Sequence, residues 1–318
     1  MLPLLKETLL LNFVEDRGLE EWRRYFSSHL PDLHIAAWDD RSVDPSSVRY
    51  ACVWKPEHGW LASFPALRVI LSEGAGVDHI LADATLPLHI PVTRMVTPET
   101  AARMADYVVM ASYMLARQIP AVVHAQQQQR WDNTLTGRLV SETTIGILGM
   151  GQLGSLAAQR LLANGFRVNG WSRSTKTVPN TGCYSGDKGL QTLLKQSDIV
   201  VNLLPDTVET RGIINDDFLA QLPKGAAIIN VGRGHQLQGE ALLRGLNRGH
   251  ISGAVLDVFP EEPLPAEDPL WHHPGIIVTG HVASLISTQA KAQHVIAVIK
   301  ADRLGQPLPV LFNREKGY

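Results

Sequence analysis

A glycine-rich turn between a short apolar run and a helical segment constrains the fold of this chain more than any other feature. Gly149, Gly151 and Gly154 follow the apolar residues 144–148 with the spacing G-x-G-x-x-G, and a helix is expected over residues 152–164. In such a unit the first glycine permits a tight turn, the second lets a pyrophosphate approach the backbone, and the third lets helix and strand pack closely. The N–H groups that open the helix would face that pyrophosphate. The unit therefore predicts dinucleotide binding, with a purely structural turn as the alternative.

The residues after the second strand of this unit indicate which dinucleotide is bound. An acidic residue about 20 positions beyond the glycines usually binds the ribose 2′-hydroxyl of NAD. This chain has Ser172, Arg173 and Ser174 there, after an apolar run that ends at Trp171. A guanidinium with flanking hydroxyls can bind a 2′-phosphate through charge-assisted hydrogen bonds. We therefore expect NADPH as the cofactor, with NADH as a weaker alternative. A solvated surface arginine is the other interpretation of Arg173.

Length, composition and charge limit the class of protein. A chain of 318 residues, 45% hydrophobic and 19% charged, is long enough for two domains with sizeable cores. The formal net charge of −2 at pH 7 gives no general electrostatic reason to bind nucleic acid or an anionic membrane. The apolar start, Leu2–Leu5 and Leu9–Leu11, is interrupted by charged residues and is expected to be a first strand. The two cysteines, Cys52 and Cys183, lie far apart, as is typical of a reduced compartment. We expect a cytoplasmic protein with no nucleic-acid or membrane partner.

Short apolar runs alternate with helical stretches along the chain, which is typical of parallel α/β folds. The runs after the glycine turn predict a doubly wound sheet with that turn at its switch point. The final helix, expected over residues 287–304, would return the chain to the first domain. We therefore predict two doubly wound parallel-sheet domains. A flavodoxin-like substrate domain would comprise residues 1–104 and 286–318, and a Rossmann-type dinucleotide-binding domain, residues 105–285, would be inserted into it.

Three polar residues follow predicted strands in the second half of the chain: Arg233, Glu262 and His281. In an open parallel sheet they would gather at the carboxyl edge, where a dinucleotide also binds. An arginine can hold a carboxylate and polarise a carbonyl, a histidine can donate a proton, and a glutamate beside it can favour the imidazolium form. This combination suits hydride delivery to a 2-oxo acid. Taken one by one, the residues could equally be a helix-capping arginine, a solvated glutamate and a surface histidine.

The segments 149–154, 230–234, 257–265 and 281–284 together resemble the motif set of the D-isomer-specific 2-hydroxyacid dehydrogenases. Within that family the chain is similar to the glyoxylate/hydroxypyruvate reductase A group, and the likeness covers nearly the whole sequence. The resemblance implies a homodimer that reduces glyoxylate, hydroxypyruvate or a similar small 2-oxo acid. The usual proline before the histidine is Gly280 here, and a glycine loosens the backbone at that point.

The resemblance also implies roles for individual residues. Arg233 would bind the substrate, Glu262 would pair with the histidine, and His281 would be the acid/base. Ala75 and Gly76 would hold the substrate carboxylate through their N–H groups, and Trp54 would line the pocket. Asp257 would contact the nicotinamide amide. The remaining predicted cofactor contacts are Gly149, Gly151, Gln152, Leu153, Gly154, Ser172, Arg173, Ser174, Leu204, Pro205, Val231 and Gly232.

Other functions fit the sequence less well. His272, His273 and His281 could suggest a metal site, but no carboxylate or cysteine has ligand spacing with them, so we predict no metal. An NAD-dependent D-2-hydroxyacid dehydrogenase with another substrate range is the alternative within the class, and the missing acidic residue near Arg173 argues against it. A non-catalytic nucleotide-sensing scaffold is the alternative from another class, because such a scaffold can keep the same residues.

Overall fold

The computed structural model describes residues 7–13, 16–314 and 317, and the chain divides into two compact units. The first unit contains the chain up to Thr100 and the chain from Ile286 onward, and the second runs from Ala101 to Leu285. The second unit is thus inserted in the first, and the change from one to the other falls near the start of the long helix α3 (Pro98–Ala116). Leu2–Leu5, expected in the first strand, lie outside the described residues.

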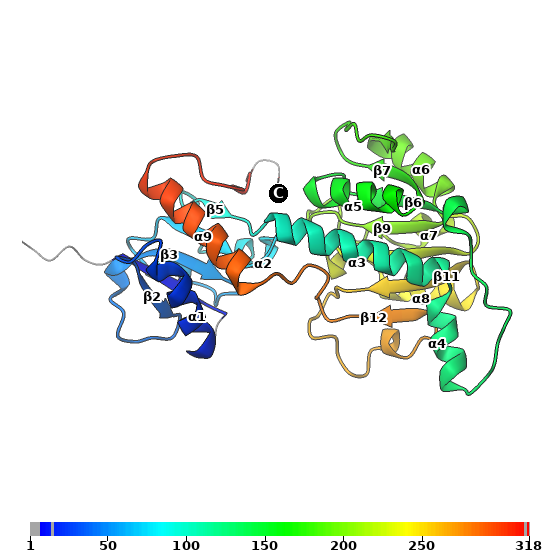
Figure 1. The fold of residues 1–318 in the computed structure, drawn as a ribbon, viewed down its shortest axis with the longest axis horizontal. Helices are drawn as coiled ribbons and strands as arrows, with labels where there is room; N and C mark the ends of the chain where they lie inside the picture. Colours follow the sequence, from blue (N-terminus) through cyan, green and yellow to red (C-terminus); the bar gives the residue numbers. More distant parts are fainter. Residues whose placement is uncertain (1–6, 14–15, 315–316, 318) are drawn as a thin grey trace, which may run out of the picture. The chain divides into compact units, whose positions relative to one another are not determined.

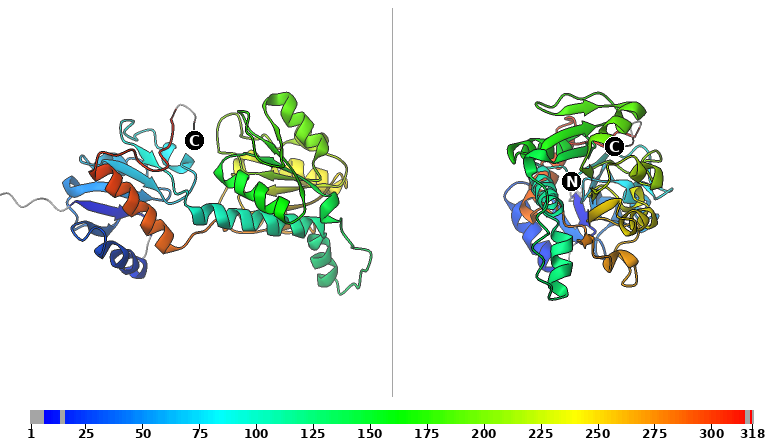
Figure 2. Two further views of the ribbon diagram at one scale, coloured as in Figure 1. Left: turned by 45° about the horizontal axis from the view of Figure 1, so that its top comes forward. Right: turned by 90° about the vertical axis from the view of Figure 1, so that its right-hand side faces the viewer.

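The first unit is a five-stranded parallel sheet in the order β2-β1-β3-β4-β5. This is the flavodoxin-like order. Helices α1 (Asp16–Ser27) and α9 (Thr288–Arg303) lie side by side on one face of the sheet (Figures 1 and 2). The strands are β1 (Thr8–Leu11), β2 (His34–Ala37), β3 (Val48–Val53), β4 (Val69–Ser72) and β5 (Val92–Thr93).

The strands of the first unit are largely apolar because both faces of the sheet are covered. Successive residues of β1 enter different cores: Leu9 and Leu11 pack with Trp22 of α1, whereas Leu10 packs with Ile80. Ile80 belongs to the short helix α2 (Asp78–Leu81), which follows β4. Because it follows the end of strand β4, the loop between β4 and α2 leaves the sheet at its carboxyl edge.

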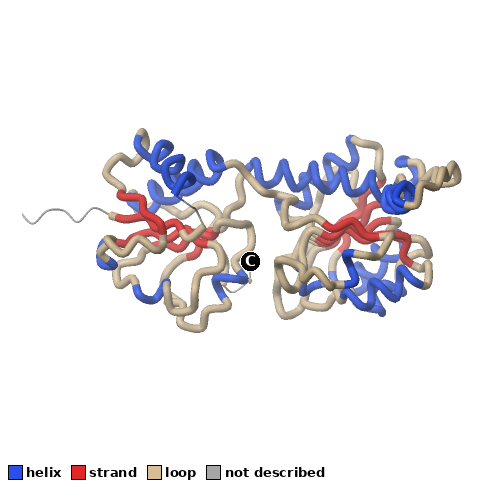
Figure 3. Tube along the Cα trace, turned by 90° about the horizontal axis from the view of Figure 1, so that it is seen from below, coloured by secondary structure: helices blue, strands red, loops and turns tan. Residues whose placement is uncertain are grey.

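The second unit is a seven-stranded parallel sheet in the order β12-β11-β10-β9-β6-β7-β8. Helices α3 and α5 cover one face, and α6, α7 and α8 cover the other (Figures 1 and 3). The order reverses between β6 and β9, which is the Rossmann arrangement with a seventh strand added. The predicted fold class is therefore confirmed.

Strands and helices largely alternate along the second unit. The strands are β6 (Thr144–Leu148), β7 (Arg167–Trp171), β8 (Gly182–Tyr184), β9 (Ile199–Asn202), β10 (Ala226–Asn230), β11 (Ile251–Leu256) and β12 (Ile276–Val278). The helices after α3 are α4 (Ile119–Gln127), α5 (Gln152–Ala163), α6 (Gly186–Gln196), α7 (Asp216–Ala220) and α8 (Gly239–Asn247). Among the described residues, no helix is long and apolar enough to cross a membrane.

Candidate active site

Each glycine of the G-x-G-x-x-G turn meets a different structural demand. Gly149 has φ 103°, and a Cβ there would lie 2.7 Å from the carbonyl oxygen of Leu203. At Gly154 a Cβ would lie 2.0 Å from the carbonyl oxygen of Gly149, so only glycine lets α5 pack this closely on the turn. A Cβ at Gly151, by contrast, would meet no atom within 4 Å. Its backbone, at the start of α5, is therefore open to a ligand.

The Ser172–Ser174 segment follows β7 at the carboxyl edge of the same sheet. The Ser172 hydroxyl donates to the carbonyl oxygen of Ser174 (2.7 Å), which closes a tight turn around the exposed Arg173. A hydrogen bond from Thr207 lowers the pKa of Glu209, and the positive charge of Arg173 adds to that effect. Arg173 therefore lies near an ionised carboxylate at the surface.

Arg233, Glu262 and His281 follow three neighbouring strands, β10, β11 and β12. His281 Nδ1 lies 2.8 Å from Glu262 Oε2, and the two side chains are 35% and 21% exposed. The other carboxylate oxygen, Oε1, accepts a hydrogen bond from the N–H of Phe259 (2.9 Å). Glu262 is thus oriented by the backbone and is not a solvated loop residue. Because Nδ1 faces the carboxylate, Nε2 is the ring nitrogen that can exchange a proton with a substrate.

Asp257, at the end of β11, organises the loop that carries His281. Its carboxylate is buried and accepts hydrogen bonds from the N–H groups of Val282 and Ala283 (2.9 Å each) and from the Thr279 hydroxyl. The N–H of His281 donates to the Asp257 carbonyl oxygen (2.8 Å), and His281 has a left-handed backbone with φ 56°. These contacts hold a left-handed backbone conformation, which is uncommon for residues other than glycine. The nicotinamide contact expected for Asp257 stays a prediction.

Tyr107 of α3 extends this chain of hydrogen bonds. Its hydroxyl lies 2.6 Å from the Thr279 hydroxyl, which itself donates to Asp257. Since Thr279 has one proton to give, Tyr107 must be the donor in their contact. Burial raises the pKa of Tyr107 to about 12, so that proton is present throughout the neutral pH range.

Gly280 offers a stabilising substitution beside His281. Its backbone lies outside the positive-φ range, and a Cβ there would meet no atom within 4 Å. Alanine would therefore fit the native backbone and restrict the unfolded chain. We expect Gly280→Ala to raise the free energy of unfolding by about 0.4–1 kcal/mol, measured by urea denaturation. A loss of stability would show that the loop needs a backbone freedom that alanine lacks.

The loops that carry Arg233 and Glu262 touch through Gly234. A Cβ on Gly234 would lie 1.8 Å from the carbonyl carbon of Phe259 and 2.2 Å from its oxygen. Phe259 is the residue whose N–H orients Glu262. The close approach at Gly234 therefore ties the position of the arginine loop to that of the Glu262–His281 pair.

A group of buried amide side chains lies beneath Arg233. Asn202 and Asn230 are the last residues of β9 and β10, Gln236 follows Arg233, and all three are fully buried. Asn202 Nδ2 donates to Asn230 Oδ1 (2.9 Å) and to Gln236 Oε1 (2.6 Å). Arg233 is partly buried, and its Nη1 donates to the carbonyl oxygen of Gly232 (2.8 Å). Our reading of the sequence missed this group, although asparagine ending two apolar strands is a visible signal.

The predicted substrate loop lies in the first unit, between β4 and α2. Arg94 Nε donates to the carbonyl oxygen of Ala75 (2.7 Å), and the Ser72 hydroxyl donates to that of Gly76 (2.8 Å). Among the described residues, none accepts a hydrogen bond from the N–H groups of Ala75 or Gly76. The loop thus has fixed carbonyls and two N–H groups that an anion could use.

Trp54 packs against the same loop. A Cβ on Gly74 would lie 2.9 Å from the Trp54 ring, and the ring centroids of Trp54 and His79 are 4.3 Å apart. The indole therefore forms one wall beside the Ala75–Gly76 backbone.

The described part of the chain contains no group of three or more histidine, cysteine, aspartate or glutamate side chains that could hold a metal ion.

Comparison with known proteins decides the family. The sequence model of the family described as "D-isomer specific 2-hydroxyacid dehydrogenase, NAD binding domain" matches residues 92–283. The chain belongs to the D-isomer specific 2-hydroxyacid dehydrogenases. The predictions of this family and of an oxidoreductase are thereby confirmed.

Relatives and solved structures agree with this assignment. A glyoxylate/hydroxypyruvate reductase A from Serratia proteamaculans is 38% identical over 90% of this chain and 92% of its own length. A D-isomer specific 2-hydroxyacid dehydrogenase from Xanthobacter autotrophicus, solved with NADPH and MES, has a TM-score of 0.91 at 38% identity, covering 98% of this chain and 100% of that one. An NADPH-dependent glyoxylate/hydroxypyruvate reductase from Sinorhizobium meliloti, solved with NADP and sulfate, has a TM-score of 0.90 at 33% identity, with 98% and 100% coverage.

Proposed function

We propose that this dehydrogenase reduces small 2-oxo acids, glyoxylate and hydroxypyruvate among them, to the 2-hydroxy acids with NADPH. The observation that carries the proposal is the contact between His281 Nδ1 and Glu262 Oε2 at the carboxyl edge of the sheet, beside the end of β10, the strand that leads to Arg233. The reductases among its relatives support the substrate class, and the NADPH-bound dehydrogenase structure supports the cofactor.

The residues of the glycine turn fit a dinucleotide. The open backbone at Gly151 and the start of α5, which includes Gln152 and Leu153, would receive the pyrophosphate. Arg173, held in a tight serine turn, would contact the 2′-phosphate. NADPH, when bound, supplies the hydride. The further predicted cofactor contacts are Leu204, Pro205, Val231, Gly232 and Asp257, all near the carboxyl ends of β9, β10 and β11.

The chain's own side chains would do the rest of the chemistry. Arg233 would hold the substrate carboxylate and polarise the carbonyl that is reduced. His281 Nε2 would donate the proton to the developing alkoxide, and Glu262 would favour the imidazolium that carries that proton. The N–H groups of Ala75 and Gly76 would also hold the carboxylate, and Trp54 would line the pocket.

A substrate panel tests the proposal. Purified protein should consume NADPH with glyoxylate and hydroxypyruvate, followed by the loss of NADPH absorbance, and more slowly with NADH. Phenylpyruvate, as a bulkier 2-oxo acid, probes the size of the pocket. Binding of NADPH without turnover on any 2-oxo acid would instead identify a nucleotide-sensing scaffold. Faster turnover with NADH would identify an NAD-dependent dehydrogenase.

Arg173 gives a prediction on cofactor choice. Arg173→Ala should weaken NADPH binding more than NADH binding, by about 10- to 100-fold, because only NADPH carries the phosphate that the guanidinium would bind. The two dissociation constants are measured by fluorescence titration. Glu209→Gln is the matched control, since it leaves Arg173 in place and removes the neighbouring negative charge. Equal weakening of both cofactors by Arg173→Ala would reject the role.

Assembly and location are also proposals. We infer a cytoplasmic homodimer from the family resemblance and the composition. Light scattering coupled to size-exclusion chromatography gives the mass of the particle directly, and a mass near that of one 34.9 kDa chain would contradict the dimer.

A further inference from the structure

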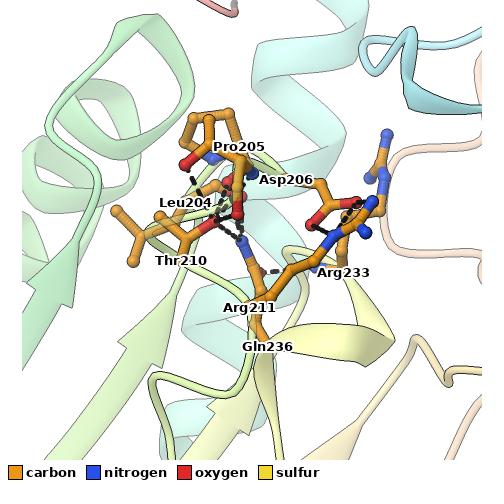
Figure 4. Close-up of polar contacts among 8 residues, drawn as sticks. Leu204, Pro205, Asp206, Thr210, Arg211, Arg233 and Gln236 are labelled. Atoms are coloured by element: carbon orange, nitrogen blue, oxygen red, sulfur yellow. Dashed lines mark hydrogen bonds and ion pairs between the residues drawn. The ribbon is translucent and has the colours of Figure 1, made fainter. Parts of the chain in front are cut away.

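The side chain of Gln236 lies between two loops of the second unit. It is fully buried, yet it carries an amide group whose donors and acceptor must be satisfied to avoid a large desolvation cost. Its partners come from the turn that bears Arg233 on one side and from the loop after β9 on the other. Figure 4 shows the Gln236 side chain between Arg233 and the residues Leu204, Pro205 and Thr210.

The oxygen of the Gln236 amide fixes the backbone of Arg233. Oε1 accepts a hydrogen bond from the N–H of Arg233 (2.8 Å), while the backbone N–H of Gln236 donates to the Arg233 carbonyl oxygen (3.2 Å). Asn230 Nδ2 also donates to that carbonyl (3.3 Å). Both backbone polar groups of Arg233 are therefore held by side or main chains of buried residues. Arg233 and Gln236 thus each accept a hydrogen bond from the backbone N–H of the other, with the glutamine side chain acting as it does in a capping box, and the two bonds fix the Arg233 backbone.

The nitrogen of the same amide fixes the loop after β9. Nε2 donates to the carbonyl oxygens of Pro205 (2.8 Å) and Leu204 (3.2 Å) and lies 3.3 Å from the Thr210 hydroxyl. Thr210 in turn donates to the Pro205 carbonyl oxygen (2.7 Å). An ion pair between Asp206 and the exposed Arg211 (2.9 Å) lies farther along the same loop (Figure 4).

The Gln236 amide is closely packed. A Cβ on Gly232 would lie 2.5 Å from Gln236 Oε1 and 2.8 Å from Asn202 Nδ2. Asn202 Nδ2 already donates to Gln236 Oε1. The Gln236 amide is therefore held by the Arg233 turn, by the loop after β9 and by Asn202. A single buried side chain thus joins the arginine turn to a loop with two predicted cofactor contacts, Leu204 and Pro205.

We propose that Gln236 is a positioning residue for substrate binding: its amide holds the Arg233 turn in register with the Leu204–Thr210 loop, so that Arg233 meets the substrate carboxylate correctly placed. This inference rests on the proposed function of Arg233. It assigns to Gln236 no contact with substrate or cofactor. It differs from a purely structural role because the effect of Gln236 on catalysis must pass through Arg233.

A double-mutant cycle separates these roles. Gln236→Met keeps the length of the side chain and removes both hydrogen-bonding atoms, and we expect it to lower kcat/KM for glyoxylate by about 10- to 100-fold because small displacements of a substrate-holding group have effects of that size. In an Arg233→Ala background the same substitution should change kcat/KM by less than about threefold, since interacting residues are not additive. Effects that multiply in the double variant would overturn the inference.

Ser197→Ala is the matched control. Ser197 is fully buried in the same unit, and its hydroxyl donates to the Leu193 carbonyl oxygen (2.7 Å) before the start of β9, at the opposite end of that strand from Asn202. It should lower thermal stability and leave kcat/KM per folded molecule unchanged. If Gln236→Met behaves like Ser197→Ala while Arg233→Ala loses activity, Gln236 is only structural and the proposed function stands. If Arg233→Ala keeps its activity, the proposed function fails and the inference with it.

A second variant covers the case in which Gln236→Met does not fold. Gln236→Glu preserves the shape and the oxygen that accepts from Arg233 and Asn202, and loses the donor to Leu204 and Pro205. We expect it to raise KM for glyoxylate relative to the wild type more than it lowers kcat, because Arg233 is a binding group. A wild-type KM in folded Gln236→Glu, with a wild-type kcat, would overturn the inference.

Discussion

Replacing His281 with alanine should lower kcat for glyoxylate reduction by about 10²- to 10⁴-fold, the usual contribution of a positioned general acid. The reason lies in the geometry of the ring. Nδ1 is 2.8 Å from Glu262, which leaves Nε2 to deliver a proton to the substrate oxygen. The affinity for NADPH should change little, because the imidazole serves proton transfer rather than phosphate binding. Stopped-flow reduction and fluorescence titration of NADPH measure the two quantities separately.

Glu262→Gln is the partner experiment, because it removes a charge and nearly preserves the shape of the side chain. A carboxylate beside the ring favours the imidazolium, which is the form that can donate a proton in reduction. Glu262→Gln should therefore lower kcat for glyoxylate reduction while leaving the affinity for NADPH nearly unchanged, because the ring loses the negative charge beside it and Glu262 makes no contact with the cofactor in the proposed mechanism.

Two results would contradict this assignment. A His281→Ala enzyme within about tenfold of the wild type would exclude the ring as the main proton donor. A Glu262→Gln enzyme that keeps the wild-type kcat would show that the negative charge of Glu262 is not needed for proton transfer. The role of Glu262 would then be one of geometry alone.

The architecture was predictable because it depends on features that are local in the sequence. Runs such as 145–148 and 226–229 lack polar side chains, as is typical of strands in a parallel sheet covered on both faces. The glycine spacing at Gly149–Gly154 then places the switch point of the sheet, since Gly149 and Gly154 leave no room for a Cβ and Gly151 leaves the backbone open. The pairing of Glu262 with His281 also followed from the rule that residues after neighbouring parallel strands share an edge.

Features that depend on contacts between distant segments were not predictable. Strand β8 (Gly182–Tyr184) has only three residues at the edge of the sheet, and it exists through backbone pairing with β7. The sequence near Gln236 gives no sign of its role beyond the spacing from Arg233. The carbonyl oxygens that accept hydrogen bonds from its amide nitrogen belong to residues far back in the chain. The carboxylate of Asp257 holds the His281 loop, and this role cannot be inferred from the family motif.

Gly234→Ala should be as damaging as loss of a catalytic group, although Gly234 itself performs no chemistry. Its φ lies outside the positive range, so conformational freedom is not the reason for a glycine here. The reason is steric: a Cβ would lie 1.8 Å from the carbonyl carbon of Phe259 and 2.2 Å from the nitrogen of Pro260. All of these are backbone atoms, which cannot rotate away, so either the Arg233 turn or the loop that leads to Glu262 must shift by about an ångström.

A displacement of that size between a substrate-holding group and its proton donor can cost about 100-fold in rate, and we expect kcat/KM for glyoxylate to fall by at least that factor. Overpacking of the same contact should also lower the free energy of unfolding by about 1–3 kcal/mol. Gly239→Ala is the matched control, because a Cβ there meets only Leu270, at an ordinary 3.6 Å, and it should leave kcat/KM nearly unchanged without lowering the free energy of unfolding. Circular dichroism establishes that Gly234→Ala is folded before its kinetics are compared. A folded variant with near-wild-type kcat/KM would show that Arg233 and the Glu262–His281 pair do not need the register that Gly234 imposes. The two loops would then act independently in the proposed active site.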